Sequence, residues 1–290
     1  MTQPQGFIDL HTHSTKSDGA MEPREVVRHA KEAGLKAIAL SDHDSIEGVE
    51  EAMDEGKKIG IEVVPAIEFS VQSETETHIL GYYIDIHDKY LLSRLEDVKK
   101  VREERTLDTH RKLTELGFDI DLNEVRAIAP SGIVGRAHFA RVMANKGYAE
   151  SVKDAFRKWL DNGRPAYSGL QLLTAAEAVE LIKRVGGMAY VAHLHLIHIS
   201  DEELEKFISS LIPHGLDGIE GYYSEYTPEM QDKFQALAKR LGIGMSGGTD
   251  FHWTMKPHIS IGKGLGNLEI PYSILEQIKS QYNQQHERNM

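Results

Sequence analysis

Cysteine is absent from the 290-residue chain, and this absence removes several kinds of chemistry at once. Without cysteine the protein has no disulfide, no thiolate metal site and no cysteine nucleophile. The chain does contain 15 histidines and 45 acidic residues. Any metal site or catalytic centre must therefore be built from imidazole and carboxylate groups.

Long apolar runs and an excess of positive charge are also missing. No run approaches the ~20 apolar residues of a membrane span, and the polar start MTQPQG lacks the basic and apolar regions of a signal peptide. The formal net charge is −12 at pH 7, which argues against a broad basic surface for long nucleic acid. We therefore expect a cytoplasmic enzyme that acts away from membranes and takes, at most, a short nucleic acid as substrate.

Strand-like and helix-like segments alternate along most of the chain. Residues 36–40 and 61–70 are typical of buried strands, and helical patterns separate the strands from one another. Such alternation predicts a parallel sheet with helices outside it and ligands at the carboxyl ends of the strands. Helical segments interrupt the pattern between residues 89 and 167. We predict one α/β barrel formed by residues 1–88 and 168–290, with a helical insertion at 89–167.

Histidine and carboxylate residues gather where the predicted strands end. His11 and His13 close the apolar run of residues 7–10, and on a strand two side chains at this spacing point the same way. One His-x-His is weak evidence in a chain with 15 histidines. The repetition of the pattern at several strand ends is much stronger, and it brings in Asp18, His43, Glu68, His78, His193, Asp250 and His252.

These residues are too many for a single metal ion. Six histidines and three carboxylates can hold two or three divalent ions through nitrogen and oxygen. Ions spaced ~3.5 to 4 Å apart suit hydrolysis of a phosphate ester, because they stabilise the attacking and leaving oxygens and acidify a water. The pattern therefore favours a phosphoesterase in which metal-bound water attacks and no protein nucleophile is needed.

Six segments carry a family resemblance. In order they are DLHTHSTKSDG, ALSDHDSIEG, the glutamate of AIEFS, the histidine of HILGY, VAH and GTDFH. Together they resemble the motifs of the PHP superfamily, named for polymerase and histidinol phosphatase, and the resemblance covers the whole chain. It implies a distorted (βα)7 TIM-like barrel, the PHP fold, with a trinuclear metal site.

The resemblance also implies which side chains hold each ion. Glu68 would bridge two ions, and manganese is the metal we expect, with iron, zinc or magnesium as alternatives. The three sets would be His11, His13, Glu68 and Asp250; then Glu68, His78 and His193; then Asp18, His43 and His252.

The segment GRAHFARVMANKG within the insertion resembles the branch of nucleotide bisphosphatases and exonucleases of short oligoribonucleotides. This resemblance makes Arg136 and His138 readers of a substrate phosphate. Gly135 and Arg136 open a predicted helix, and a helix N-terminus binds anions through free backbone amides. The expected substrates are 3′,5′-nucleotide bisphosphates, losing the 3′-phosphate to give a 5′-monophosphate, or short 5′-phosphorylated oligoribonucleotides.

Four residues near the expected site have open roles. His195 shares a face with His193 if the strand continues, so His195 is an alternative ligand, or else it lines the substrate mouth together with His198. Asp42 is expected to bind loop backbone, or else to support a ligand. Glu220 ends a strand and faces the site if the strand register allows it.

Two other functions compete with this hypothesis. Within the same chemistry, the protein could be a nucleoside monophosphate or histidinol phosphate phosphatase. From another class, it could be a non-catalytic module that uses its ions for folding or for binding a partner. The complete set of motif residues favours an enzyme, whereas the sequence leaves the natural ester, the oligomeric state and any protein partner undetermined.

Overall fold

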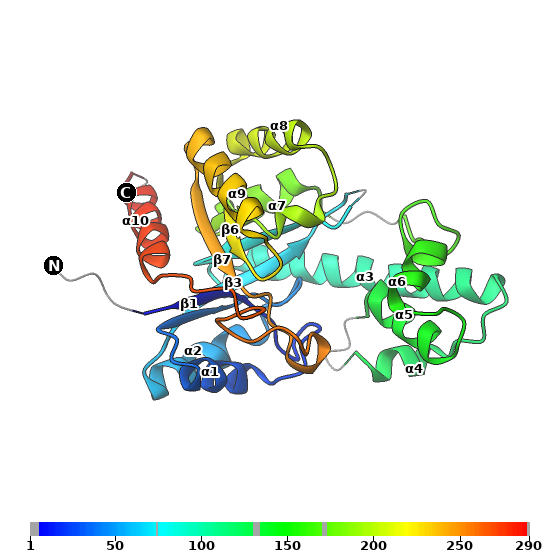
Figure 1. Ribbon diagram of the computed structural model, residues 1–290. Coiled ribbons are helices and arrows are strands. Elements are labelled where there is room, and N and C mark those ends of the chain that lie inside the picture. The colour runs from blue at the N-terminus through cyan, green and yellow to red at the C-terminus, as the bar shows by residue number, and fades with distance from the viewer. Residues whose placement is uncertain (1–5, 74, 130–133, 170–172, 289–290) are drawn as a thin grey trace. The chain divides into compact units, whose positions relative to one another are not determined.

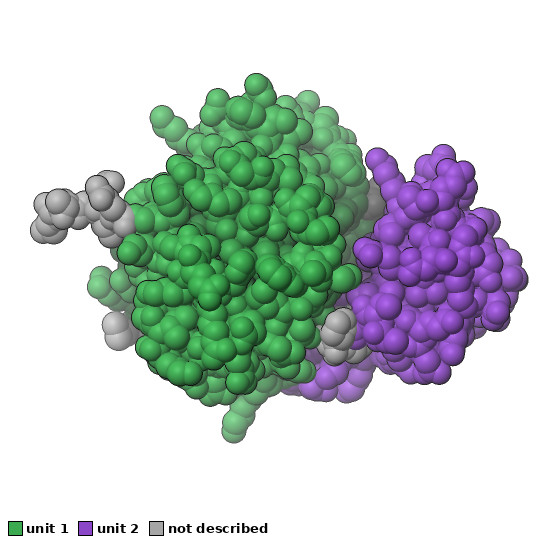
Figure 2. All heavy atoms as spheres, turned by 60° about the horizontal axis from the view of Figure 1, so that its bottom comes forward, with its two compact units in different colours: residues 1–92, 173–290 green, residues 93–172 purple. Residues whose placement is uncertain are grey.

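The computed structural model describes residues 6–73, 75–129, 134–169 and 173–288 (Figure 1). The chain divides into two compact units (Figure 2). The first unit comprises residues 1–92 and 173–290, and the second comprises residues 93–172. Within the described residues every strand belongs to the first unit, and the second unit is helical.

Seven strands form one sheet whose order follows the chain: β1 (Ile8–Thr12), β2 (Ala37–Leu40), β3 (Glu62–Ser70), β4 (His78–Tyr82), β5 (Met188–Val191), β6 (Leu216–Tyr223) and β7 (Gly244–Gly248). Neighbouring strands run parallel except β4, which is antiparallel to both β3 and β5. The expectation of a parallel sheet is therefore wrong at β4. Only residues 71–77 separate β3 from β4, and parallel neighbours need a connection of a dozen or more residues.

The sheet curls until its first and last strands meet. The backbone amide of Asp250, just after β7, donates to the carbonyl of His11 in β1 at 2.8 Å. Gly248 makes the close approach possible, because a Cβ there would lie 2.4 Å from the backbone nitrogen of His11. The first unit is thus a mixed α/β fold around a nearly closed barrel of seven strands.

Alternate strand residues fill the inside of this barrel. The apolar residues at positions 8 and 10 of β1, 37 and 39 of β2, and 64 and 66 of β3 belong to one buried cluster. Tyr82 and Tyr190 meet in the same cluster with ring centroids 5.4 Å apart. Because side chains alternate between the two faces of a strand, the intervening residues of β2, Ile38 and Leu40, pack instead under the outer helices.

The α-helices that lie wholly within the described residues of the first unit are α1 (Pro23–Glu32), α2 (Val49–Ile59), α7 (Ala175–Arg184), α8 (Asp201–Leu211), α9 (Pro228–Leu241) and α10 (Ser273–Arg288) (Figure 1). Pro23 begins α1, because its fixed φ suits the first turn. Gly60 ends α2 in a left-handed conformation with φ of 73°. Among the described residues no helix combines the length and the apolar character that a membrane crossing requires.

The second unit has a hydrophobic core of its own. Its helices are α4 (Leu122–Ala127), α5 (Arg136–Asn145) and α6 (Val152–Ala155), followed by a π-helical turn at Phe156–Leu160, and the long helix α3 (Lys89–Glu115) leads into it from the first unit. Leu113 of α3 and Phe139 of α5 are buried in one cluster, against which Trp159 packs. Such a core is what allows the unit to be compact by itself.

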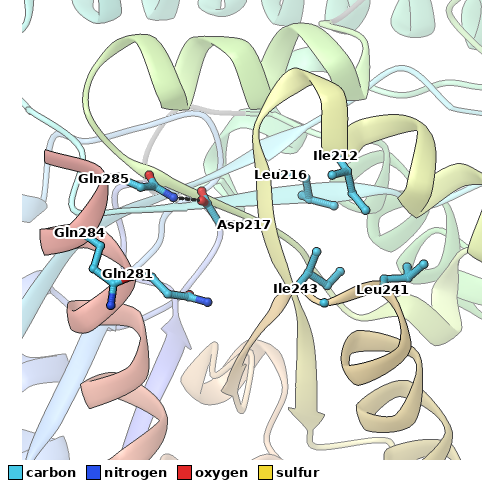
Figure 3. Close-up of a pocket in the computed structure, with 9 residues that line it drawn as sticks. Ile212, Leu216, Asp217, Leu241, Ile243, Gln281, Gln284 and Gln285 are labelled. Atoms are coloured by element: carbon cyan, nitrogen blue, oxygen red, sulfur yellow. Dashed lines mark hydrogen bonds between the residues drawn. The ribbon is translucent and has the colours of Figure 1, made fainter. Parts of the chain in front are cut away.

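A pocket lies at the amino ends of β6 and β7 (Figure 3). It is therefore at the end of the barrel opposite to the carboxyl ends of these two strands. Apolar side chains such as Leu216 and Ile243 line it together with glutamines of α10. Its one charged lining residue, Asp217, is already paired with Lys183 at 2.7 Å and accepts from Gln285. These contacts tie α7 and α10 to β6, so the polar groups of this pocket serve the barrel's own structure.

Candidate metal centre

Nine side chains that the sequence singles out come together at one rim of the barrel. His11 and Glu68 lie near the carboxyl ends of β1 and β3, and all the others except His78 follow β1, β2, β5 or β7. His78 is the first residue of β4, and because β4 is antiparallel its amino end lies at this same rim. We call these residues the rim cluster: His11, His13, Asp18, His43, Glu68, His78, His193, Asp250 and His252.

Glu68 is the centre of the rim cluster, and its two oxygens face different groups of imidazoles. Its Oε2 lies 3.2 Å from Nε2 of His11 and of His13 and 3.1 Å from Nδ1 of His43. Its Oε1 lies 3.0 Å from Nδ1 of His78 and 3.0 Å from Nε2 of His193. A carboxylate placed between two sets of nitrogen ligands is suited to bridging two ions.

The other two carboxylates lie on either side of this centre. Asp250 Oδ1 is 3.2 Å from Nε2 of His13 and 3.6 Å from Nε2 of His11. Asp18 Oδ1 is 3.0 Å from Nε2 of His252, and its other oxygen is 3.7 Å from Nε2 of His43. The imidazoles are shared among the carboxylates, since His252 also lies 3.3 Å from Asp250 and His13 lies 3.7 Å from Asp18.

Ligand atoms close enough to share one ion fall into three groups. They are His13, Asp18, His43 and His252; then His11, His13 and Asp250; then His43, Glu68 and His78, with the atoms of each group within 4.8 Å of one another. The family pattern assigns nearly the same sets. It differs in three ways: it adds Glu68 to the set of His11 and Asp250, leaves His13 out of the set of Asp18, and places His193 rather than His43 beside Glu68 and His78. Nε2 of His193 indeed lies 3.1 Å from Nδ1 of His78.

Several polar atoms of the cluster are buried against one another at ion-pair distance, and among the described residues none of them makes a hydrogen bond of good geometry. They include Nε2 of His11 and His13, Nδ1 of His43 and Oε2 of Glu68. Burying such groups without a partner costs roughly 1–3 kcal/mol each. Divalent cations would satisfy all of them at once, and the donor set of imidazole nitrogen and carboxylate oxygen is the one that manganese, iron and zinc accept. The residues present therefore fit the metal ions that the family implies.

The charges of the cluster also call for cations. Burial would raise the pKa of the Glu68 carboxyl, but the imidazoles of His11, His43 and His78 hold it well below its ordinary value. Burial opposes a charge on His11 and His13, yet Glu68 and Asp250 raise the pKa of His11 well above its usual range and that of His13 to about 9. In metal-free protein, protons on imidazoles thus supply the positive charge that the carboxylates require.

The metal-free protein is expected to lose stability as pH rises from about 6.5 to about 9. His13 has a folded pKa of about 9 against an ordinary value of 6.5, so its contribution is complete below pH 6.5 and disappears as pH passes 9. Glu68 and Asp250 stay ionised throughout this window because their pKa values are lowered. Melting curves of chelated protein across the window check this. Manganese should reverse the trend by replacing the protons, and a flat profile in the chelated protein would contradict the charge pattern.

Glu220 contacts two histidines of the rim cluster. It is fully buried, its Oε1 lies 3.0 Å from Nδ1 of His11, and its Oε2 accepts the backbone amide of His193 at 2.7 Å. The contact with Nδ1 leaves Nε2 of His11 facing Glu68. Glu220 thus contacts the rim cluster, and we expect it to orient His11 as other carboxylates orient metal-binding histidines.

Asp42 shapes the loop that carries His13 and Asp18. It accepts the backbone amide of Ser14 at 2.7 Å and the hydroxyls of Ser14 and Ser17 at 2.6 Å each. It is not part of any of the three ligand groups. Asp42 thus bonds to both the backbone and the hydroxyl groups of this loop, and its role in the site stays a prediction.

His193, and not His195, points into the cluster. Nε2 of His195 lies 3.2 Å from the carboxylate of Glu225, outside the ligand groups found among the described residues, whereas Nε2 of His193 contacts Glu68. His193 has φ of 22° and Asp250 has φ of 56°, backbone conformations that are costly for residues other than glycine. The structure holds both residues in these conformations at the rim. His198 is exposed.

Three supporting residues escaped the sequence analysis. Asp9 is buried and accepts the backbone amides of Thr249 and Gly262, which holds the loop of Asp250 against β1. The hydroxyl of Tyr223 donates to Oδ2 of Asp250 at 2.8 Å, and the ammonium of Lys256 contacts the same oxygen. The sequence could have pointed to Asp9, because an aspartate in the middle of an apolar strand is unusual. It held no comparable signal for Tyr223 or Lys256.

The two residues expected to read phosphate lie in the second unit. Arg136 is the first residue of α5, its Nη1 donates to the carbonyl of Leu160 at 3.3 Å, and its guanidinium lies 5.4 Å from the ring centre of Tyr167. His138 is buried, and its Nδ1 accepts the backbone amide of Gly135 at 2.9 Å, which caps the start of α5. His138 therefore has a structural role in addition to any contact with a substrate.

Known proteins resemble this chain over nearly its whole length. A 5′-3′ exoribonuclease of Haemophilus influenzae is 32% identical over 89% of this chain and 93% of its own length. A 3′,5′-nucleoside bisphosphate phosphatase of Chromobacterium violaceum is 33% identical over 84% of this chain and 87% of its own length. Both names describe hydrolases of phosphate esters.

Solved structures show the same likeness. A Chromobacterium violaceum protein described as an amidohydrolase, with bound sulfate and no metal, aligns with a TM-score of 0.82 and 30% identity over 94% of this chain and 96% of its own. A Bifidobacterium adolescentis protein assigned as a metal-dependent phosphoesterase aligns with a TM-score of 0.79 and 27% identity over 95% and 96% of the two chains.

The fold, the rim cluster and these relatives define the class: the protein is a metal-dependent hydrolase of phosphate esters. The profile of the PHP domain matches residues 9–250, and the chain belongs to the PHP family. The family resemblance read from the six sequence segments is thereby confirmed.

Proposed function

We propose that the protein hydrolyses 3′,5′-nucleotide bisphosphates, releasing the 3′-phosphate and leaving a 5′-monophosphate, and that short 5′-phosphorylated oligoribonucleotides are related substrates. One observation carries the proposal. Glu68 lies between two sets of imidazoles in a cluster where all nine motif positions hold a side chain able to bind metal. The names of the two curated relatives support the choice of substrate.

The rim cluster would hold two or three divalent ions, most suitably manganese, with iron, zinc or magnesium as alternatives. Such ions supply an acidified water as nucleophile and neutralise charge on the phosphate. The protein's own part is to fix the ligands. Glu68 would bridge two ions, while Glu220 fixes the orientation of His11 and Asp42 fixes the loop of His13. No side chain is required as a covalent nucleophile.

We assign the ligands of each ion according to the family pattern. Glu68 would belong to two sets, and the third set would be formed without it. In this assignment the first ion is held by His11, His13, Glu68 and Asp250, the second by Glu68, His78 and His193, and the third by Asp18, His43 and His252.

The helical insertion at residues 89–167 is proposed to bind the part of the substrate that is not cleaved. Arg136 begins α5 beside two aromatic rings, and a guanidinium can grip a phosphate through paired hydrogen bonds. A second phosphate gripped by Arg136, with a weaker contribution from His138, would distinguish a bisphosphate from a monoester. The barrel itself is proposed to be a distorted (βα)7 TIM-like barrel, and the cytoplasm is the proposed location.

A comparison of substrates tests this proposal. Manganese-loaded protein is incubated with adenosine 3′,5′-bisphosphate, 3′-AMP, 5′-AMP, histidinol phosphate and a 5′-phosphorylated tetraribonucleotide, and products are separated by chromatography. We expect the bisphosphate to be cleaved with the highest kcat/KM and to yield 5′-AMP. A preference for 5′-AMP or histidinol phosphate would select the alternative phosphatase, and inactivity on every ester would select a non-catalytic module.

A further inference from the structure

Lys256 places a positive charge at the edge of the rim cluster. It follows the short 3-10 turn Trp253–Met255, and its ammonium contacts Oδ2 of Asp250. Its side chain is 39% exposed, while that of Asp250 is only 6% exposed. Lys256 is thus a solvent-accessible residue in contact with a buried residue of the rim cluster. None of the six motif segments includes it.

The two oxygens of Asp250 have separate surroundings. Oδ1 faces the cluster, with Nε2 of His13 at 3.2 Å and Nδ1 of His252 at 3.3 Å. Oδ2 faces away from these rings and meets Lys256 and the hydroxyl of Tyr223. Lys256 therefore leaves the inward oxygen available to a metal ion and adds its charge on the outer side.

Holding Asp250 in place does not account fully for the lysine. The hydroxyl of Tyr223 donates to the same Oδ2 at 2.8 Å, and the backbone amide of Asp250 is fixed to β1 through His11. An ammonium has three N–H donors, and within the described part of the chain Asp250 is the one side-chain acceptor recorded for it. The half-exposed position leaves the other donors for a group that approaches the cluster from solvent.

We propose that Lys256 binds a non-bridging oxygen of the substrate phosphate at the rim cluster, while Asp250 keeps its ammonium in place. This inference rests on the proposed function only in assuming a phosphate ester as substrate. The ligand is recognised by its chemistry, since a phosphate oxygen is an anionic acceptor and a charge-assisted hydrogen bond to it is among the stronger polar contacts. Lys256 would then be a binding residue on the barrel itself, independent of Arg136 in the second unit.

The test measures binding of inorganic phosphate, which needs no knowledge of the natural ester. Phosphate is titrated calorimetrically into manganese-loaded wild-type protein and into the Lys256→Gln and Lys256→Arg variants, and metal content is measured for each. Lys233→Gln is the matched control, because Lys233 is an exposed lysine paired with Asp201 on the outer helices. We expect Lys256→Gln to weaken phosphate binding about tenfold or more with unchanged manganese content. Lys256→Arg should restore most of the affinity, and Lys233→Gln should match wild type.

Two outcomes would overturn the inference. Wild-type phosphate affinity in Lys256→Gln would mean that the lysine does not touch the anion. Joint loss of manganese and phosphate, with a lower melting temperature, would mean that it acts only by holding Asp250. KM for the best ester should rise in Lys256→Gln more than kcat falls. If the bisphosphate is not cleaved but phosphate still binds, the proposed substrate is wrong and the test of Lys256 remains valid.

Discussion

Replacing Glu68 with glutamine is expected to lower both metal content and turnover by at least about 100-fold, since even the supporting neighbours of metal ligands commonly change affinity 10–100-fold. The substitution keeps the shape of the side chain and removes its charge. One carboxylate oxygen becomes an NH₂ group, which cannot bind a cation. Depending on the orientation of the amide, this NH₂ group would face either His78 and His193 or the imidazoles of His11, His13 and His43. Bridging between two ions would be lost.

Metal content by mass spectrometry and kcat on the preferred ester measure this effect together. Glu225→Gln is the matched control, because Glu225 is a carboxylate at the same end of the barrel that pairs with His195 outside the ligand groups. It should keep its ions and most of its activity. Full occupancy and near-normal turnover in Glu68→Gln would show that Glu68 is not the bridging ligand.

Replacing Arg136 with alanine is expected to reduce activity selectively. If the guanidinium grips a desolvated phosphate, its loss should cost roughly 2 to 5 kcal/mol, or about 30-fold to several thousand-fold in kcat/KM for a 3′,5′-bisphosphate. A small monoester that does not reach Arg136 should be hydrolysed almost as before. Kinetics on the two substrates, with a melting curve of each protein, separate this outcome from general damage.

The local contacts of Arg136 define the competing outcome. Its guanidinium donates to the carbonyl of Leu160 and lies near the rings of Phe156 and Tyr167, so alanine would also remove packing within the second unit. Arg141→Ala, on the exposed side of the same helix, controls for loss of charge. Equal losses on both substrates, together with a lower melting temperature, would lead us to abandon the bisphosphate hypothesis. His138→Ala is a poorer probe because it also removes a cap of α5.

Much of the rim cluster could be predicted because strand ends are informative. His11, His193 and Asp250 lie where strands meet loops, and the carboxyl ends of parallel strands share one edge of a sheet. His78 reached the same rim by another route. Its strand is antiparallel, so its first residue, rather than its last, lies at this edge. The alternation of strands and helices did not reveal this reversal, which depended on a connection too short for a crossover.

The supporting residues depended on contacts between distant parts of the chain. Asp9 meets Thr249 across 240 positions, and Glu220 meets His11 across 209. Lys256 reaches Asp250 only because the turn after His252 folds back over the rim. No local sequence pattern predicts such pairs, because the two residues come into contact only when the barrel has closed. Similarly, the choice between His193 and His195 rested on a left-handed backbone at His193 that sequence spacing does not specify.

The claim of metal-dependent hydrolysis is tested most directly by measuring phosphate release from adenosine 3′,5′-bisphosphate. The protein is first thoroughly chelated, and manganese is then added back stepwise. The account predicts no release without ions, and activity that rises to a plateau when two or three manganese ions are bound per chain, with 5′-AMP as the other product. Full turnover by the chelated protein, or an unchanged bisphosphate at saturating manganese, would contradict it.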